Sequence, residues 1–557
     1  MSDLLNQASL VYIPSGYKED TAYSVIPTDG SGDLTFTRAS DGTRVNSSGL
    51  VENVPWNLFT YSEQFENSDW LFGGLGKPTM TDNFAEAPNG TMTASKMEAA
   101  SAGYQLRQNN AQENTQMNLS VWLRTNTGTK TIQLFINNGS TASQNITVTT
   151  TWTRYEINGF VTSLSGGGRN GLNTFESLTS SSYILVWGAQ TNTGTTAKPY
   201  FPTTDRQNVP RLTYEGGCPS LLLEPQATAL NTNSENAAGW TAVGSTITSD
   251  STTSPSGVQN ADTITYSSSG SRIQQDFTIS DTKATLSVFV KSNSGDGAYL
   301  IIRNNTTATN LVTVAFTGET FTAGAGGETI SYANGWYRIS VTATSGISSG
   351  NTLRAYIYSD SGQGVVSGSS VYVWGMNCTN TSYLQSYIPT TSAAVTRVAD
   401  LASAPQGTHG NFGTNPFCVF LDVNFAKLSS TGAIALLGNR QSSNWWRIYS
   451  NGSEFRLELN GSNGFVSDIF LNQGTLTSRT KIAFNRNGND MKIYVNGSQT
   501  FAASSAVYSS DFTTGNTQID FNSWYAGVYE ITATEYNEVV LFKQSLTASE
   551  LAALTTL

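Results

Sequence analysis

Two stretches of the chain, SYILVWGAQ (182–190) and SVYVWGMNC (370–378), each carry a Trp-Gly pair in an apolar run. Each run is followed by nearly the same ending, YFPTTDRQNVPRL from Tyr200 and SYIPTTSAAVTRV from Ser386. Apolar runs of this length, rich in β-branched and aromatic residues, are typical of β-strands. The repetition indicates that one β-rich unit is present twice.

Further landmarks keep the same order in both halves. They are NLFTYSEQFENSDW (57–70) and ALNTNSENAAGW (229–240), LSVWLRTNTG (119–128) and LSVFVKSNSG (286–295), and TWTRYEI (151–157) and GWYRISV (335–341). A unit of this length is too long for a solenoid repeat. The sequence therefore predicts a duplicated domain.

Within each copy, apolar residues alternate with polar ones. Leu119, Val121 and Leu123 share one face of an extended strand, which indicates a sheet that is buried on one side. Charged residues make up only 12% of the chain, against a usual share of about 25%. The 11% of aromatic residues argues against disorder. We predict an all-β protein of tandem β-sandwich jelly rolls.

Charge and apolar patterning restrict the partners. The formal net charge is −11 and basic residues form no stripe, so we expect no nucleic-acid partner. The sequence has no apolar run of 18 residues, so we expect no membrane span, and its start does not read as a secretory signal. Cys218, Cys378 and Cys418 lie far apart without CxxC spacing, and we expect buried free thiols.

The order of these strands resembles the carbohydrate-binding-module jelly-roll superfamily, over about 57–205 and 226–392. The resemblance implies glycan binding, in which an aromatic ring stacks on a sugar. Trp122 is the candidate in the first copy, because the second copy has Phe289 there. Core packing is the alternative for Trp122, and we favour it for the four tryptophans that occupy paired strand positions, Trp152, Trp187, Trp336 and Trp374. Arg154 and Arg338 are expected to make structural hydrogen bonds.

GSGDLTFTRASDGTRVNSSGLVENV (30–54) and NVPRLTYEGGCPSLLLEPQATAL (208–230) resemble two halves of one stretch in phage virion proteins. The resemblance is to fibre and appendage proteins of Bacteroidetes and crAss-like phages. It implies a virion structural protein, made in the host cytoplasm, whose N-terminal region binds other virion proteins. It also implies that the first sandwich is inserted into this collar. Arg38, Arg44 and Arg211 are expected to pair with acids such as Asp41, Glu52 or Glu215.

In the last third of the chain, apolar and polar residues alternate in a different set of strand-like stretches. This third resembles the laminin-G or concanavalin-like lectin jelly roll. KIAFNRNGNDMKIYVNG (481–497) predicts a hairpin that turns at Asn-Gly-Asn-Asp, and a short C-terminal helix is expected to begin at Thr547 or Ser549. The resemblance implies glycan or protein binding, through calcium in some members. Asp422, Asp490 and Asp520 stand singly, so we predict no metal and no other cofactor.

Aromatic residues provide the best hint of a site in this third. Trp445, Trp446, Trp524 and Tyr525 are candidate glycan-binding residues. Adjacent strand residues point to opposite faces, so at most one of Trp445 and Trp446 belongs to the core.

Catalysis has little support in the sequence. The sole histidine, His409, stands in a turn-like stretch without a Ser-Asp arrangement. Glu454, Glu458 and Asp490 are most simply solvated strand or turn residues, and no carboxylate pair stands out. We expect no enzymatic activity.

These observations predict an N-terminal attachment segment, two sandwiches with a collar continuation between them, and a lectin-like domain; the ranges are 1–56, 57–206, 207–230, 231–398 and 399–557. The predicted function is that of a phage appendage, fibre or capsid decoration that binds host-surface or mucosal glycans weakly, as a homo-oligomer and plausibly a trimer. The alternatives are a secreted or surface-attached bacterial carbohydrate-binding adhesin and, third, a capsule depolymerase.

Overall fold

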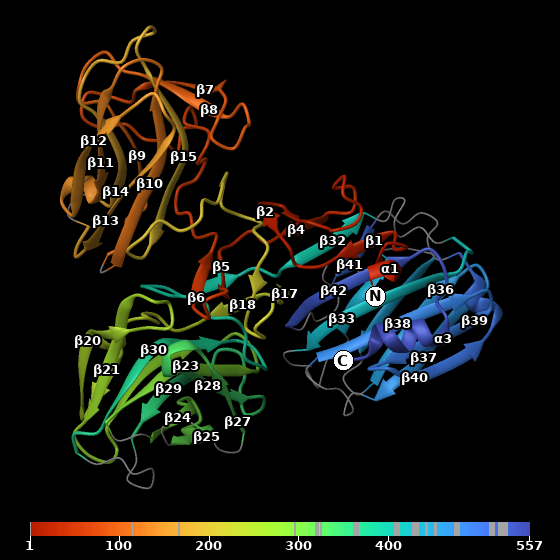
Figure 1. Ribbon diagram of the computed structural model, residues 1–557. Helices are drawn as coiled ribbons and strands as arrows, with labels where there is room; N and C mark the ends of the chain where they lie inside the picture. Colours follow the sequence, from red (N-terminus) through yellow and green to blue (C-terminus); the bar gives the residue numbers. More distant parts are fainter. Residues whose placement is uncertain are drawn as a thin grey trace. The chain divides into compact units, whose positions relative to one another are not determined.

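The computed structural model of this chain divides into two units (Figure 1). Unit 1 is Met1–Val51, Asn208–Thr248 and Thr263–Leu557, and unit 2 is Glu52–Gln207 with Ser249–Asp262. The structure describes residues 2–113, 115–164, 167–294, 297–317, 322–323, 326–359, 367–405, 413–425, 434–439, 444–450, 454–472, 479–511, 518–521 and 533–557.

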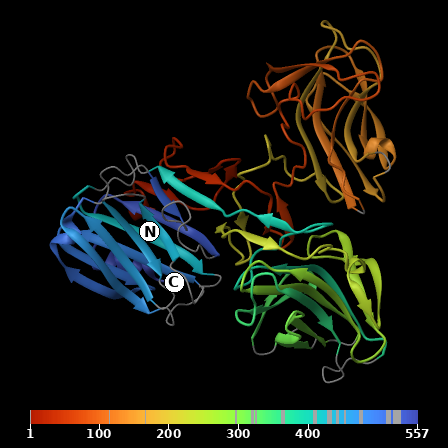
Figure 2. The ribbon, with the colours of Figure 1, turned by 180° about the vertical axis from the view of Figure 1, so that it is seen from behind.

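Unit 2 contains the first copy of the duplicated domain, folded as two facing antiparallel sheets (Figures 1 and 2). One sheet has the order β13-β10-β15-β8-β7 and the other β12-β11-β14-β9. Leu119, Val121 and Leu123 of β10 are buried in the shared core, as their alternation predicts. The strands are β7 (Thr79–Ala85), β8 (Ala94–Glu98), β9 (Gln105–Asn109), β10 (Thr115–Thr125), β11 (Lys130–Ile136), β12 (Ala142–Val148), β13 (Thr153–Val161), β14 (Arg169–Thr174) and β15 (Ile184–Thr193).

The second copy repeats this architecture in unit 1. One sheet contains the run β30-β23-β28-β27, in which β18 pairs with β30 and β31 pairs with β18, and the other has the order β19-β22-β29-β24-β25-β26. The strands are β18 (Ala227–Ala229), β19 (Thr241–Val243), β20 (Ser245–Thr253), β21 (Gln259–Tyr266), β22 (Arg272–Thr278), β23 (Ala284–Ser294), β24 (Gly297–Asn304), β25 (Thr309–Thr317), β26 (Thr322–Ala323), β27 (Gly327–Ser331), β28 (Tyr337–Ala343), β29 (Thr352–Tyr358), β30 (Ser370–Thr379) and β31 (Val395–Arg397).

The C-terminal third forms a further sandwich in unit 1. Its sheets have the orders β16-β17-β42-β33-β38-β39-β40 and β2-β3-β4-β32-β41-β34-β35-β36-β37, and β1 pairs with β42. The C-terminal strands are β32 (Leu401–Pro405), β33 (Phe417–Phe425), β34 (Ile434–Asn439), β35 (Trp445–Ser450), β36 (Glu454–Gly461), β37 (Gly464–Asn472), β38 (Arg479–Asn487), β39 (Asp490–Val495), β40 (Ser498–Ser504), β41 (Gln518–Phe521) and β42 (Thr534–Phe542).

The segments expected as a collar, 1–56 and 207–230, supply strands to this C-terminal sandwich. β1 and β17 pair with β42, and β4 pairs with β32. Leu10, Phe36 and Leu221 are accordingly buried in its core. The collar therefore does not stand apart from the domain expected at 399–557. The strands concerned are β1 (Leu10–Tyr12), β2 (Tyr17–Lys18), β3 (Thr21–Ala22), β4 (Leu34–Thr37), β5 (Gly42–Val45), β6 (Val51–Val54), β16 (Leu212–Thr213) and β17 (Ser220–Leu223).

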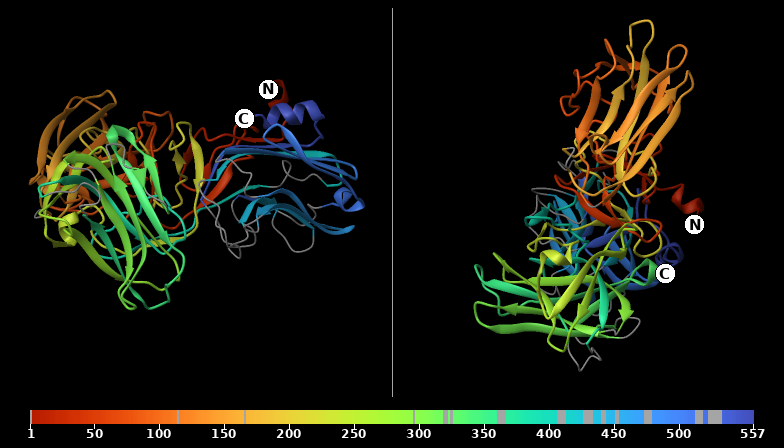
Figure 3. Two further views of the ribbon diagram at one scale, coloured as in Figure 1. Left: turned by 90° about the horizontal axis from the view of Figure 1, so that it is seen from below. Right: turned by 90° about the vertical axis from the view of Figure 1, so that its left-hand side faces the viewer.

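Short helices lie at the two ends of the chain, on the same side of the C-terminal sandwich (Figure 3). Thr547 begins the C-terminal helix: its side chain accepts a hydrogen bond from the Glu550 N–H group, and the Glu550 side chain bonds back to Thr547, which confirms the predicted cap. The α-helices are α1 (Ser2–Leu5) and α3 (Ala548–Thr555), and the 3-10 turns are η1 (Asn137–Gly139), η2 (Ala237–Gly239), η3 (Ala333–Gly335) and η6 (Ala506–Ser509).

The predicted fold class is confirmed: the chain is built of tandem antiparallel β-sandwiches. The predicted hairpin is confirmed as well, because β38 and β39 pair with Asn487 opposite Asp490. Asn496 and Gly497, in the following turn, have positive φ angles of 48° and 83°, which Asn and Gly tolerate best.

Candidate functional site

The repeated ending closes each sandwich with a tyrosine. In the first copy the Tyr200 ring lies 4.9 Å from Trp187 and 5.4 Å from Trp122, centroid to centroid. Its hydroxyl group lies 2.9 Å from the Ser62 hydroxyl and donates to the Glu63 carboxylate at 2.9 Å. The ending is therefore packed on the sheet and hydrogen-bonded to the opening segment.

The second copy repeats this closure. The Tyr387 ring lies 4.8 Å from Trp374 and 6.1 Å from Phe289. Its hydroxyl group lies 2.6 Å from the Ser234 hydroxyl and donates to Glu235 at 3.2 Å. Matching partners in both copies explain why the chain contains the same ending twice.

An arginine in each copy connects the ending to the sheet. Arg154 donates to the Ser120 hydroxyl at 3.0 Å and to the Lys198 carbonyl at 2.9 Å. Arg338 makes the same two bonds in the second copy, to Ser287 at 3.0 Å and to the Gln385 carbonyl at 2.8 Å. The structural role expected for both arginines is confirmed.

The tryptophans in paired strand positions are mostly core residues. Trp187, Trp336 and Trp374 are buried, which confirms the core interpretation, whereas Trp152 is half-buried. Trp122 is half-buried, with the Arg154 guanidinium 4.5 Å above its ring centroid. This guanidinium covers the ring that was expected to stack on a sugar.

A cluster of buried charges lies where the second ending meets the N-terminal segments of unit 1. Arg38, Arg211 and Asp400 are connected: Arg38 reaches one Asp400 oxygen at 2.8 Å, and Arg211 bonds to the other. Arg211 also lies 2.8 Å from Glu224, and Arg397 lies 2.7 Å from the same carboxylate. All five side chains are almost completely buried, so each charge depends on its partners.

The partners of Arg38 and Arg211 in this cluster differ from the acids named as candidates. Arg38 pairs with Asp400, 362 positions away, and Arg211 pairs with Asp400, 189 positions away, and with Glu224 in its own collar segment. Arg44 donates to the Leu212 carbonyl at 3.0 Å. The pairing with Asp400 was missed because sequence spacing carries no information about contacts over such separations.

Ser386 joins the second ending to the cluster. Its N–H and hydroxyl groups donate to Glu224, and its hydroxyl oxygen accepts from Arg211 and Arg397 at 2.7 Å each. Burial raises the pKa of Glu224, but Arg397 and Arg211 outweigh it and lower the pKa to about 2. Glu224 is therefore a fixed, ionised carboxylate.

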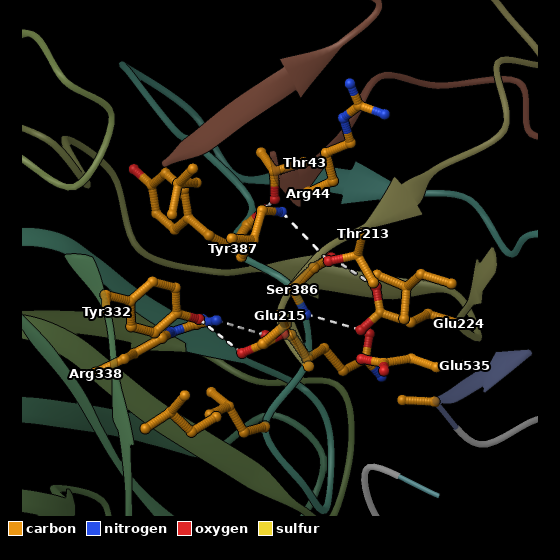
Figure 4. A pocket seen from close by; sticks show the side chains of 18 of the residues that line it. Thr43, Arg44, Thr213, Glu215, Glu224, Tyr332, Arg338, Ser386, Tyr387 and Glu535 are labelled. Atoms are coloured by element: carbon orange, nitrogen blue, oxygen red, sulfur yellow. Dashed lines mark hydrogen bonds between the residues drawn. The ribbon is translucent and has the colours of Figure 1, made fainter. Parts of the chain in front are cut away.

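A pocket of about 270 Å3 opens beside this cluster in unit 1 (Figure 4). Its inner wall is buried and consists mainly of Phe289, Arg338 and Tyr387 from the second sandwich and Thr43 from the N-terminal segment. At its rim, Glu215 is exposed and Tyr332, Ile330 and Asn424 are half-exposed. Figure 4 shows Tyr332 and Arg338 on one side and Glu224 and Glu535 on the other, with Glu215 between them.

Two carboxylates line the pocket, Glu215 and Glu535. Glu215 accepts the Tyr332 hydroxyl at 2.9 Å across the pocket. Glu535 is buried and accepts from Ser220 at 3.2 Å and Asn424 at 3.1 Å. Burial, with the negative charge of Glu215 and Glu224 nearby, raises the pKa of Glu535 to about 7.

Two residues that line the pocket carry buried donors. Among the described residues, the Nε2 group of Gln385 and the Nε group of Arg338 find no hydrogen-bond partner, although both side chains are at most 4% exposed. The Gln385 Oε1 atom accepts from Arg397, so the amide orientation is fixed. Buried N–H groups without partners are costly, and a ligand oxygen would satisfy them.

The C-terminal aromatic candidates are only partly described. Trp446 is buried in the core, so its ring is closed to a ligand, whereas Trp445 is half-buried beside the exposed ring of Phe465, 6.1 Å away. This agrees with the expectation that at most one of the adjacent pair is core. Trp524, Tyr525 and His409 lie outside the described residues.

The remaining expectations concern the cysteines, a metal site and a membrane span. Cys378 and Cys418 are buried free thiols, but Cys218 is exposed, contrary to expectation, because it stands in a Gly-Gly turn at the surface. Across the described ranges, no three His, Cys, Asp or Glu residues gather where they could hold a metal ion. Nor do these ranges contain a helix long and apolar enough to span a membrane.

Comparisons with known proteins give only distant likenesses. No family model and no curated protein matches the sequence. The CBM40 module of the Ruminococcus gnavus IT-sialidase, bound to α2,3-sialyllactose, is similar at 12% identity and a TM-score of 0.23, over 26% of this chain and 85% of the module. The receptor-binding domain of a botulinum neurotoxin C/D mosaic serotype is similar at 14% identity and a TM-score of 0.24, over 28% of this chain and 40% of that one.

Proposed function

We propose that this chain is a non-catalytic glycan-binding protein and that the pocket of unit 1 holds a sugar residue. The observation that carries the proposal is the composition of the pocket wall. Tyr332 supplies a half-exposed aromatic ring that packs on the buried ring of Phe289 with centroids 5.0 Å apart, and Gln385 supplies a buried N–H group without a partner among the described residues. Binding sites of this kind combine apolar surface with a few fixed polar groups.

A sugar fits both the apolar and the polar parts of this wall. Its ring has C–H faces that pack on aromatic side chains, and its hydroxyl groups both donate and accept hydrogen bonds. In the pocket, Gln385 and Arg338 offer donors, and Glu215 and Glu535 offer acceptors. A ligand with hydroxyl groups around a ring would satisfy donors and acceptors at once.

The setting that we propose for this binding is a phage particle. The support is the amino-acid sequence of residues 30–54 and 208–230, which resembles that of virion appendage proteins. On such a particle, many copies would turn weak single-site binding into firm attachment to host-surface or mucosal glycans. Mass spectrometry of purified particles and of the cell fraction tests this setting; presence in the cells alone would favour a bacterial adhesin.

One observation favours hydrolysis as a second candidate. Glycosidases use two carboxyl groups whose pKa values are driven apart, and Glu535 and Glu224 have values of about 7 and about 2. Against it, Glu224 is bound to Arg211, Arg397 and Ser386, which leaves it poorly placed to attack a sugar or to activate water.

A glycan array tests the binding proposal. We expect the intact protein to bind, and Tyr332→Ala to lose at least tenfold in affinity because the aromatic rim and its bond to Glu215 disappear. Trp122→Ala serves as the comparison, since it changes the first sandwich only. Loss of binding with Trp122→Ala and not with Tyr332→Ala would place the site elsewhere and contradict the proposal.

Incubation with host capsular polysaccharide separates binding from hydrolysis. We expect no new reducing ends in the presence of the intact protein. Their release, with loss of activity in Glu535→Gln, would establish the depolymerase instead.

A further inference from the structure

We propose that the outer face of one sheet of the second sandwich binds acidic sugar residues of a glycan chain. This site goes beyond the proposed function, because it lies on a different sheet from the pocket. Phe289 and Arg338 of the pocket belong to β23 and β28, whereas the new site is formed by β22, β24 and β29 of the other sheet.

Alternation along these three strands determines which side chains point outward. Leu353, Ala355 and Ile357 of β29 are buried in the core, so the residues between them lie on the outer face. β22 and β24 alternate in the same way, with Ile273 and Leu300 in the core. The tyrosines and arginines among the outward residues form what we call the tyrosine–arginine face: Tyr299, Tyr356, Tyr358, Arg272, Arg303 and Arg354.

Strand register brings the three tyrosines of this face together. Tyr358 lies opposite Arg272 on one side and opposite Tyr299 on the other. The rings of Tyr356 and Tyr358 are perpendicular, with centroids 6.5 Å apart. All three tyrosines are half-buried, so part of each side chain stays exposed. The face therefore offers aromatic side chains on which the C–H groups of a sugar ring can pack.

The tyrosine–arginine face is positively charged in a chain whose net charge is −11. Among the outward positions described in these three strands, Asp276 is the sole acid, and Arg354 binds both of its carboxylate oxygens. Arg272 and Arg303 have no ion pair with a described residue, since their hydrogen bonds go to neutral groups. Two positive charges are thus left unbalanced, and they attract an anionic group.

The bonds of Arg272 leave part of its guanidinium group to a ligand. Its Nε group donates to the Gln274 Oε1 atom at 2.9 Å, and its Nη1 group donates to the Gly270 carbonyl at 3.2 Å. Its Nη2 group makes no hydrogen bond to a described residue. The guanidinium carbons of Arg272 and Arg354 both lie 5.9 Å from the Tyr356 ring centroid. A fork-shaped cation is therefore held beside an aromatic ring.

An acidic glycan matches this combination better than a nucleic acid does. A nucleic acid requires a stripe of cations along its phosphate backbone, and this face has two unbalanced ones. A sugar ring with one carboxylate or sulfate requires an aromatic ring and a neighbouring guanidinium, which Tyr356 and Arg272 provide. The shared chemistry of these ligands is an anionic oxygen group on a sugar.

The first sandwich provides a matched control. Its corresponding sheet has no tyrosine among the outward residues described in β9, β11 and β14. Arg169 of β14 points outward and is half-buried, as Arg272 is, but it lies opposite Asn109 instead of a tyrosine. Arg169→Gln therefore removes the same charge from a face that lacks the aromatic surface.

The test measures binding of immobilised polymers to the intact protein by biolayer interferometry at pH 7.5. The probes are hyaluronan and alginate, which carry carboxylates, dextran sulfate, neutral dextran and a thymidine oligonucleotide. We expect an acidic glycan to bind at least tenfold more tightly than dextran, and its affinity to fall as salt is raised. Whether the carboxylated or the sulfated polymers bind more tightly identifies the anionic group.

Variants locate this binding on the tyrosine–arginine face. We expect Arg272→Gln to lose at least fivefold in affinity for the acidic glycan. Arg272→Lys, which keeps the charge but not the fork, should lose two- to threefold, and so should Arg303→Gln. Arg169→Gln should leave the affinity unchanged. Circular dichroism verifies that each variant is folded.

The other outcomes overturn the inference. Equal binding of dextran and the acidic polymers would contradict the charge argument, and unchanged binding by folded Arg272→Gln and Arg303→Gln would refute the assignment. Tightest binding of the oligonucleotide would show a nucleic-acid site instead. Loss of acidic binding in Tyr332→Ala would place it in the pocket. If no acidic polymer binds, this inference fails, whereas the pocket is tested separately on the glycan array.

Discussion

The two copies of the sandwich share a closing device and differ in what surrounds it. Tyr200 and Tyr387 pack on a tryptophan and bond to a Ser-Glu pair in the same way. The residue just before the tyrosine differs: it is Pro199 in the first copy and Ser386 in the second. Only a hydroxyl and an N–H group at this position can join the buried arginine cluster. The residue before the tyrosine thus differs in what it can bond, and in the second copy it connects the ending to the buried charges of unit 1.

The largest effect is expected from removing a charge at the centre of the cluster. Asp400→Ala leaves Arg38 and Arg211 buried without their shared carboxylate, and we expect it to destabilise unit 1 by about 3–5 kcal/mol. Scanning calorimetry should show the transition of unit 1 moving to lower temperature while that of unit 2 stays. Equal shifts of both transitions would contradict the comparison.

A pH-dependent effect is expected from the carboxyl group that receives the tyrosine. Burial raises the pKa of Glu235 to about 7, so the folded state holds a proton that the unfolded state releases near 4.5. The contribution of Glu235 to the stability of unit 1 should therefore be greatest below pH 4.5. It should fall as the pH rises to about 7, by at most about 3 kcal/mol.

The two copies allow this pH dependence of stability to be measured in a matched pair of glutamates. Chemical denaturation between pH 4.5 and 8 should show a flatter profile for Glu235→Gln than for the wild type. Glu63→Gln should flatten the profile of unit 2 in the same direction, because burial raises the pKa of Glu63 as well. A steeper profile in either variant would contradict the sign of the argument.

The glycine after each tryptophan should reveal a smaller difference. Gly188 and Gly375 have positive φ angles of 61° and 60°. A Cβ atom would lie 3.0 Å from the Trp122 ring in the first copy and 2.8 Å from the Phe289 ring in the second. Alanine at either position should cost about 1–3 kcal/mol, more at Gly375, as measured by thermal unfolding of each variant. A neutral effect at Gly375 would show that the aromatic packing is not tight there.

The smallest effect is expected at the surface of the first copy. Lys198 lies 3.0 Å from Glu52 in a partly exposed ion pair. Lys198→Gln should change the stability of unit 2 by less than about 1 kcal/mol in a urea titration, because such pairs are screened by solvent. A loss as large as that of Asp400→Ala would remove the distinction between the buried and exposed pairs.

Local patterns in the sequence predicted local structure well. The alternation of Leu119, Val121 and Leu123 placed one face of β10 in the core, and the Asn-Gly turn and the Thr547 cap appear where expected. Each of these depends on neighbours within a few residues. The physical cause is therefore visible in a short window.

Features that depend on distant residues were not predictable in the same way. Leu10 lies opposite Leu541 in a sheet, and Arg38 reaches Asp400, yet nothing near either residue indicates its partner. The pocket likewise combines Thr43, Arg338 and Glu535 from three parts of the chain. Of the aromatic candidates, Trp446 proved to be core because burial depends on the whole sheet, whereas Trp122 and Trp445 are half-buried.

The way the chain leaves and re-enters unit 1 bears on its tolerance of inserted domains. Asn208 accepts hydrogen bonds from the backbone N–H groups of Asp20 and Arg38, and Tyr214 donates to the Val45 carbonyl. The return point is thus anchored by residues that precede the insertion, whatever is spliced between Val51 and Asn208. Because both ends of the inserted segment are held in this way, we expect a different domain joined at the same two points to leave the fold of unit 1 intact.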